Sequence, residues 1–229
     1  MPTHLTYFLI LGLSIIGPLA LSFDRKVAFF RKWRFLFPAM LLPVFIYLAW
    51  DIVFTRAGVW SFNPCYITGI YLVNLPLEEV LFFLVVPYCC VFIYECIRCY
   101  FPAIGTFTRS DRLLQLIGLL LLIAGLIFFR RAYTSVTFCF TALFISMLYA
   151  FPGFFRGFSA AFFLVSYAVS LLPFLVVNGF LTALPVVEYN NAENLRIRIH
   201  TIPFEDIFYG MLLLLMIVAL YERRRNRSV

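Results

Sequence analysis

Residues 76–83, PLEEVLFF, return 127 positions later as residues 203–210, PFEDIFYG. Both copies place a proline two residues before a pair of acids and then continue as an apolar run. The same offset matches further polar residues without a gap: Asp51 with Asn178, Thr55 with Thr182, Asn63 with Asn190, and Tyr94–Glu95 with Tyr221–Glu222. Chance similarity between apolar segments would not align the few polar residues, so we interpret the chain as an internal duplication.

The composition indicates a protein that lies within a membrane. Of the 229 residues, 64% are hydrophobic and only 13% are charged, whereas soluble domains are about half apolar and about a quarter charged. Seven apolar stretches are each long enough to cross about 30 Å of hydrocarbon as a helix. They cover approximately residues 5–22, 35–54, 77–97, 113–129, 133–151, 158–178 and 204–222. No basic segment precedes the first stretch, so we expect it to remain as a span.

The repeat and the number of spans together predict the architecture. We expect a first three-helix repeat at 1–100, a linker with the fourth span at 101–131, and a second repeat at 132–229. The fourth span restores the chain direction, so both repeats cross the membrane the same way about a pseudo-twofold axis along its normal. The predicted fold class is an all-α integral membrane protein with about seven transmembrane helices, in two parallel three-helix repeats joined by a linking helix.

The distribution of basic residues predicts the orientation in the cell membrane. Thirteen of the 18 Lys and Arg residues fall on the side that carries the C-terminus. The positive-inside rule therefore puts the N-terminus outside and the C-terminus in the cytoplasm. The net charge of +7 is then a topology signal, aided by anionic membrane lipid, and requires no nucleic-acid partner.

The two acidic pairs allow two interpretations. Carboxylates in the first turn of a helix cap free N–H groups and balance the helix dipole, which accounts for Glu78 and Glu205 at least as well as catalysis does. Capping explains less well why a second acid, Glu79 or Asp206, follows each time. Ionisable groups inside spans are candidates for function by default. We therefore expect the second acid of each pair to be functional.

These acids and their neighbours favour one kind of chemistry. Carboxyl groups that gather in a dry site cannot all ionise, so the cluster offers both a proton donor and an acceptor. Aromatic faces attract cations, and Phe82, Phe83 and Tyr209 lie within one helical turn of an acid. Together these groups favour protonation of an alkene dissolved in lipid, formation of a carbocation and loss of a proton. Further polar residues either orient the acids or cap helix ends and loops: Asp51, Asn74, Asn178 and Asn190.

Other chemistries lack their motifs. The sequence has no GxG, so it gives no sign of a flavin or nicotinamide site. Cys96 and Cys99 form one CxxC, but a zinc site needs more ligands, and both histidines fall on the opposite side. We therefore expect no cofactor and no metal.

The PLEEVLFF and PFEDIFYG elements, together with residues 186–206, VVEYNNAENLRIRIHTIPFED, resemble the heterodimer-type lycopene cyclases, which use no flavin. In that family two small homologous three-span polypeptides act together or are fused into one chain, and this sequence resembles the fused form over nearly its whole length. The resemblance implies a lycopene β-cyclase that takes its carotenoid substrate from the bilayer. It places the family's motif carboxylates on Glu78, Glu79, Glu205 and Asp206.

The resemblance also implies a stepwise mechanism. Glu79 or Asp206 protonates C2 of a lycopene end group, the C5–C6 double bond attacks the cation at C1, and Glu78 or Glu205 removes the C6 proton to give a β ring. Removal from C4 would give an ε ring instead. The repeats differ where Asp51 becomes Asn178 and Phe83 becomes Gly210, which leaves open whether there are one or two working sites.

Two other functions remain as alternatives. A proton-coupled membrane transporter would use the acids as ion sites, although transport favours inverted repeats and these repeats are predicted to be parallel. A carotenoid-binding membrane subunit would use the aromatics to pack a pigment and the acids only as caps. The sequence gives no oligomeric state.

Overall fold

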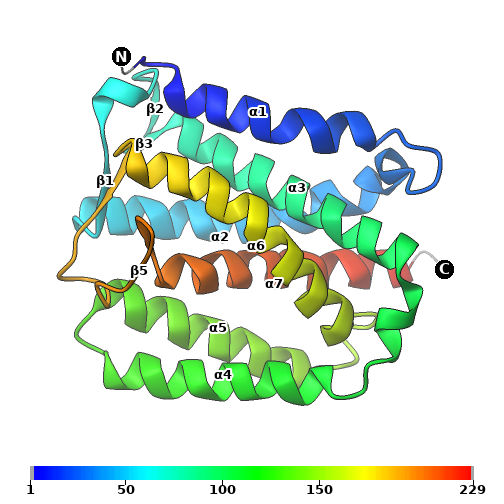
Figure 1. The fold of residues 1–229 in the computed structure, drawn as a ribbon. Helices are drawn as coiled ribbons and strands as arrows, with labels where there is room; N and C mark the ends of the chain where they lie inside the picture. The colour runs from blue at the N-terminus through cyan, green and yellow to red at the C-terminus, as the bar shows by residue number, and fades with distance from the viewer. Residues whose placement is uncertain (1–2, 228–229) are drawn as a thin grey trace.

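The computed structural model describes residues 3–227, and this part of the chain forms a bundle of seven long helices (Figure 1). In chain order the helices are α1 (Thr6–Leu21), α2 (Trp33–Arg56), α3 (Leu77–Tyr100), α4 (Ser110–Ile127), α5 (Ala132–Ala150), α6 (Ala160–Ala183) and α7 (Glu205–Asn226). Each helix overlaps a span predicted from the sequence and differs from it by a few residues at its ends. The all-α prediction is therefore confirmed.

The outside of the bundle suits a lipid environment. Helices α2 to α6 are long and apolar enough to cross a membrane, and α1 is a shorter apolar helix of 16 residues. Helix α7 is not among the helices that meet this criterion, because it carries acids in its first turn and three arginines in its last turn. Large apolar side chains are exposed around the bundle, among them Leu13, Leu41, Phe45 and Leu172. Such a surface indicates a membrane protein.

The two repeats are visible in the backbone. Helices α1–α3 and α5–α7 run in matching directions, and α4 returns the chain between them (Figure 1). The hairpins that precede α3 and α7 have the same register at the offset of 127. They consist of β2 (Tyr71–Leu72) with β3 (Leu75–Pro76), and of β5 (Arg198–Ile199) with β6 (Ile202–Pro203). Even the left-handed turn residue is repeated, with φ of 62° at Val73 and 57° at His200. The prediction of two parallel repeats is confirmed, whereas the domain limits at 100 and 131 stay a prediction.

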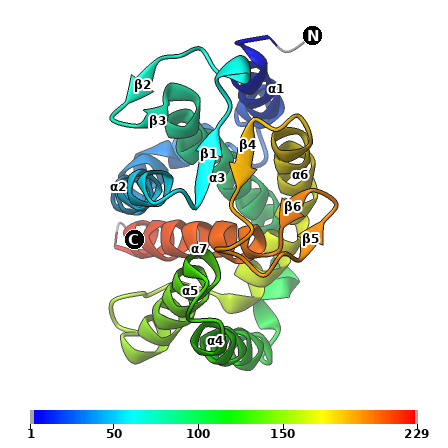
Figure 2. The same ribbon diagram turned by 90° about the vertical axis from the view of Figure 1, so that its left-hand side faces the viewer.

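A two-stranded ribbon joins the repeats at the end of the bundle where α3 and α7 begin (Figure 2). Strand β1 (Trp60–Phe62) pairs antiparallel with β4 (Val187–Tyr189), and Ser61 lies opposite Glu188. Because these two residues are themselves 127 apart, the ribbon is centred on the pseudo-twofold axis. Three short 3₁₀ turns complete the connections: Phe29–Lys32, Pro64–Tyr66 and Pro102–Thr106.

Helix α7 forms the centre of the bundle (Figures 1 and 2). Its side chains are buried in two runs, Met211–Leu215 and Ile217–Ala219, that cover all of its faces. A helix that is apolar all round is a core helix and not a surface one. Its repeat partner α3 is also heavily buried, and the acids in the first turn of both helices lie inside the protein.

At the opposite end of the bundle the repeats exchange hydrogen bonds between residues related by the same offset of 127. The hydroxyl of Tyr94 donates to Glu222 at 3.1 Å, and that of Tyr221 donates to Glu95 at 2.9 Å. Arg225 binds Glu95 at 3.0 Å and lies 3.6 Å from Glu222. We call these four Tyr and Glu residues the Tyr–Glu cluster.

Basic residues neutralise the two buried carboxylates of the cluster. Glu95 and Glu222 are each about 1% exposed, and they pair with Lys32 and Arg98 respectively. Removing one partner of a buried ion pair costs about 3–5 kcal/mol, since it leaves a charge without compensation. The cluster therefore holds the two repeats together at this end.

Candidate active site

The four motif carboxylates separate into two pairs with different surroundings. Helix α3 begins at Leu77, with Pro76 as its cap residue, and neither α3 nor α7 has a side-chain cap at its start. Of the two interpretations of Glu78 and Glu205, the structure does not favour helix capping, because both carboxylates accept hydrogen bonds from the preceding loops.

Glu78 and Glu205 hold those loops in place. The backbone N–H of Thr68 donates to Glu78 Oε1 at 2.7 Å, and that of Leu195 donates to Glu205 Oε1 at 2.7 Å. Thr134 also donates to Glu205, at 2.5 Å. Both carboxyl groups are fully buried, and neither is among the residues that line the cavity described below. Their geometry is that of loop anchors.

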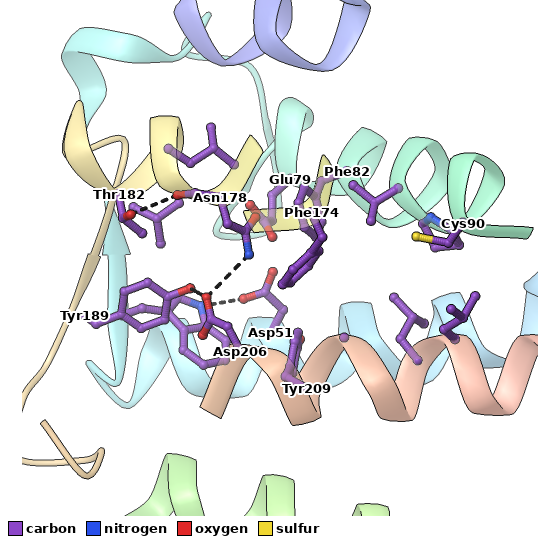
Figure 3. A pocket seen from close by; sticks show the side chains of 18 of the residues that line it. Asp51, Glu79, Phe82, Cys90, Phe174, Asn178, Thr182, Tyr189, Asp206 and Tyr209 are labelled. Carbon is purple, nitrogen blue, oxygen red and sulfur yellow. Dashed lines mark hydrogen bonds between the residues drawn. The ribbon is translucent and has the colours of Figure 1, made fainter. Parts of the chain in front are cut away.

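Glu79 and Asp206 face one shared cavity (Figure 3). The hydroxyl of Tyr7 on α1 donates to Glu79 Oε2 at 2.6 Å. Asp206 accepts from Tyr133 at 2.6 Å and from Tyr189 at 2.9 Å, one on each oxygen. Each acid is thus fixed by a tyrosine from the first helix of its own repeat.

Asp51 supplies a third carboxyl group to the same cavity (Figure 3). Its Oδ1 accepts from Trp60 Nε1 at 2.5 Å and from Thr55 at 3.4 Å, and its buried Oδ2 has no partner among the described residues. The repeat partner of Asp51, Asn178, instead donates to Asp206 at 3.5 Å. The two repeats therefore differ in charge at this position.

The cavity is small and largely aromatic. Its volume is about 70 Å³, and Asp51, Glu79 and Asp206 are between 1% and 9% exposed. The ring of Tyr209 forms part of its wall, 5.9 Å from that of Tyr133 and 6.0 Å from that of Trp60, measured between centroids. A proton source beside several aromatic faces, shielded from water, is suited to forming and stabilising a cation.

Tyr189 lies in the ribbon, outside the helices, and it acts as a fixed donor. Burial, followed by the charge of Asp206, raises its pKa well above the usual 10. The phenol therefore stays protonated and keeps its hydrogen bond to the carboxyl group. Among residues 3–227, no group of three or more His, Cys, Asp or Glu side chains is arranged to hold a metal ion.

The structure brings together some of the predicted site residues and separates others. The cavity is lined by Asp51, Glu79, Phe82, Asn178, Asp206 and Tyr209. Phe83 is instead packed against Tyr47, with ring centroids 5.7 Å apart. Asn74 donates to the carbonyl of Ile52, and Asn190 donates to that of Gly58, so both stabilise loops.

Sequence reasoning missed the two tyrosines that hold the acids. Tyr7 and Tyr133 are 126 residues apart, so the gapless offset of 127 places Tyr7 opposite Thr134 and hides the match. A search that allowed one inserted residue between the first and second helices of the repeats would have found the pair.

Comparison with known proteins agrees with the duplication. A protein-family model described as lycopene cyclase matches residues 4–97 and, a second time, residues 130–223. Each matched segment covers the three helices of one repeat except for the last turn of the third, and leaves out α4. No curated protein and no solved structure matches the chain.

Proposed function

Because the chain belongs to the lycopene cyclase family, we propose that it closes the end groups of lycopene into β-ionone rings, giving γ- or β-carotene without net oxidation. The observation that carries the proposal is the convergence of Asp51, Glu79 and Asp206, from both repeats, on one cavity lined with aromatic rings. One shared cavity supports a single working site.

Hydrogen bonding favours Glu79 as the proton donor. Both oxygens of Asp206 already accept hydrogen bonds from tyrosines, which favours its carboxylate form and makes it the poorer candidate for the proton donor. Glu79 accepts only one bond within the described residues, on Oε2, which leaves Oε1 free to carry the proton. An alkene is a much weaker base than a carboxylate, so this proton must be held in a fixed position close to the substrate carbon.

The reaction then needs a stabilised cation and a proton acceptor. Protonation of C2 puts the positive charge on C1, the C5–C6 double bond forms the C1–C6 bond, and the charge moves to C5. The faces of Tyr209, Trp60 and Phe82 stabilise this cation, at about 2 kcal/mol or more per desolvated contact. Loss of the C6 proton restores the double bond as C5=C6 and completes the β ring.

We assign the proton acceptor to Asp51, whose Oδ2 lies in the same cavity and has no partner in the described part of the chain. The family resemblance pointed instead to Glu78 or Glu205. Both are engaged with loop backbone outside the cavity, which disfavours that role. Asp206 then serves as a fixed negative charge that stabilises the cation.

We further propose that the cavity lies toward the outer face of the cell membrane. The basic residues of the 23–34 loop and the C-terminal arginines lie at the opposite end of the bundle, which the positive-inside rule assigns to the cytoplasm. Lycopene would then approach from the bilayer.

The test is expression in lycopene-accumulating bacteria, followed by chromatography of the pigments. We expect γ- or β-carotene from the unmodified chain and at least a 100-fold loss of ring formation in Glu79→Gln. Glu78→Gln is the matched control, since it makes the same chemical change one residue away, outside the cavity, and we expect it to keep most of the activity. Unchanged lycopene with the unmodified protein folded in the membrane would refute the proposal.

A further inference from the structure

The acid cavity adjoins a second, larger cavity on the lipid side of the bundle. This groove of about 730 Å³ lies between α1, α3 and α6, and we call it the α1–α6 groove. Its outer walls include Leu13 and Val176, which are 72% and 58% exposed, so the groove opens toward the hydrocarbon. The two cavities share four lining residues: Val86, Cys90, Ser170 and Phe174.

The acid cavity has a polar end and an apolar end. Along one face of α3 it is lined by Glu79, Phe82, Val86 and Cys90, which span about 16 Å of helix (Figure 3). The acids occupy the polar end of the cavity, and the groove adjoins the apolar end, beyond Phe82. An extended hydrocarbon with its last carbons at Glu79 would therefore leave the cavity through the groove.

The other repeat closes the corresponding path with aromatic rings. At the offset of 127, Val177 in the groove corresponds to Trp50 on α2. Trp50 packs against Phe140 of α5, with centroids 5.5 Å apart. In α1 and α5 the match of Tyr7 with Tyr133 sets the offset at 126, so Phe140 corresponds to Ser14, which lines the groove. Large rings thus stand where the groove has small side chains.

A second difference between the repeats makes room at the junction. Gly210 corresponds to Phe83, whose ring is buried in the first repeat. A Cβ atom at Gly210 would lie 3.2 Å from Cζ of Phe174. The glycine therefore allows the Phe174 ring to lie between the groove and the acid cavity, where a modest rotation would open the connection.

We propose that the α1–α6 groove is the entrance through which an acyclic polyene hydrocarbon passes from the bilayer to the acids, and that it is the single entrance. The wall of four residues that the groove shares with the acid cavity carries this assignment, and it rests on the proposed function for the identity of the polyene. A single entrance admits one end of the substrate at a time. The free half of the polyene then lies in the groove while the first ring forms.

The test fills the groove with the residues that close the other path. The variant Ser14→Phe/Val177→Trp is compared with Leu41→Phe/Leu172→Trp, which adds the same side chains at positions that are 71% and 69% exposed and line neither cavity. Val176→Trp narrows the groove at its exposed rim, and it keeps the test valid if the double variant fails to fold. The readouts are ring formation in membranes and the lycopene that co-purifies with the protein in a Glu79→Gln background.

We expect the groove variants to lose at least tenfold in both readouts and the control to lose neither. Normal ring formation and normal pigment binding in the groove variants would overturn the entrance while leaving the cyclase intact. If the unmodified chain left lycopene unchanged but bound it in a manner that depends on the groove, the proposed reaction would fail and the entrance would stand.

Discussion

The hydroxyl of Tyr7 offers a sharp test of how the acids are held. It is buried, lies 2.6 Å from Glu79 Oε2 and makes the one hydrogen bond that Glu79 accepts within the described residues. A hydrogen bond to a charged group contributes about 1.5–3 kcal/mol, and Glu79 becomes charged as it gives its proton to the substrate. At about 1.4 kcal/mol per tenfold change in rate, Tyr7→Phe should slow ring formation by about 10- to 100-fold.

Asp206 provides the internal comparison. Tyr189→Phe removes one donor, but Tyr133 still holds the other oxygen at 2.6 Å, so the loss should be smaller than for Tyr7→Phe. Initial rates are measured in membranes with lycopene at several concentrations, and a positioning role predicts a fall in kcat with little change in KM. Equal losses in the two variants, or full activity in Tyr7→Phe, would refute this account of Glu79.

Three further outcomes are expected. Glu222→Gln should lower the free energy of unfolding in detergent by about 3 kcal/mol in a thermal melt, because it removes the buried carboxylate that balances the partly buried Arg98. An unchanged melting temperature would show that the Tyr–Glu cluster does not contribute to stability. Val73→Asn should raise the stability by up to about 1 kcal/mol, because Asn tolerates a φ of 62° better than a β-branched residue does; a lower melting temperature would contradict this. Gly210→Phe should abolish ring formation, because the new ring would occupy the space of Phe174; normal product formation would contradict the packing argument.

Much of the fold could be predicted because polar residues are rare in this chain. Asp51, Asn178 and the two acidic pairs stand out against apolar spans, and one offset aligns them all. Since a membrane helix must satisfy its own backbone, each apolar stretch allows essentially one structure. The seven helices and the meeting of Glu79 with Asp206 at one depth followed from these two facts.

The finer features of the site depended on rotation and packing. Consecutive residues on a helix point about 100° apart, so one acid of each pair faces the cavity and its neighbour faces a loop. Glu78 and Glu79 are adjacent in the sequence, but the sequence does not reveal the rotation of the helix about its axis, which decides which of the two faces the cavity. The same limit applies to Phe82, which lines the cavity, and to Phe83, which packs against Tyr47.

The central position of α7 has a consequence for biogenesis. This helix leaves the ribosome after the other six, yet it fills the middle of the bundle and carries Asp206, the acid that completes the cavity, in its first turn. During synthesis, the first six helices must therefore be in the bilayer before the helix that fills their core has been made. Chains cut short before α7 would expose that core to lipid and to the membrane quality-control proteases, so late truncations should be degraded and should not persist as partly active forms.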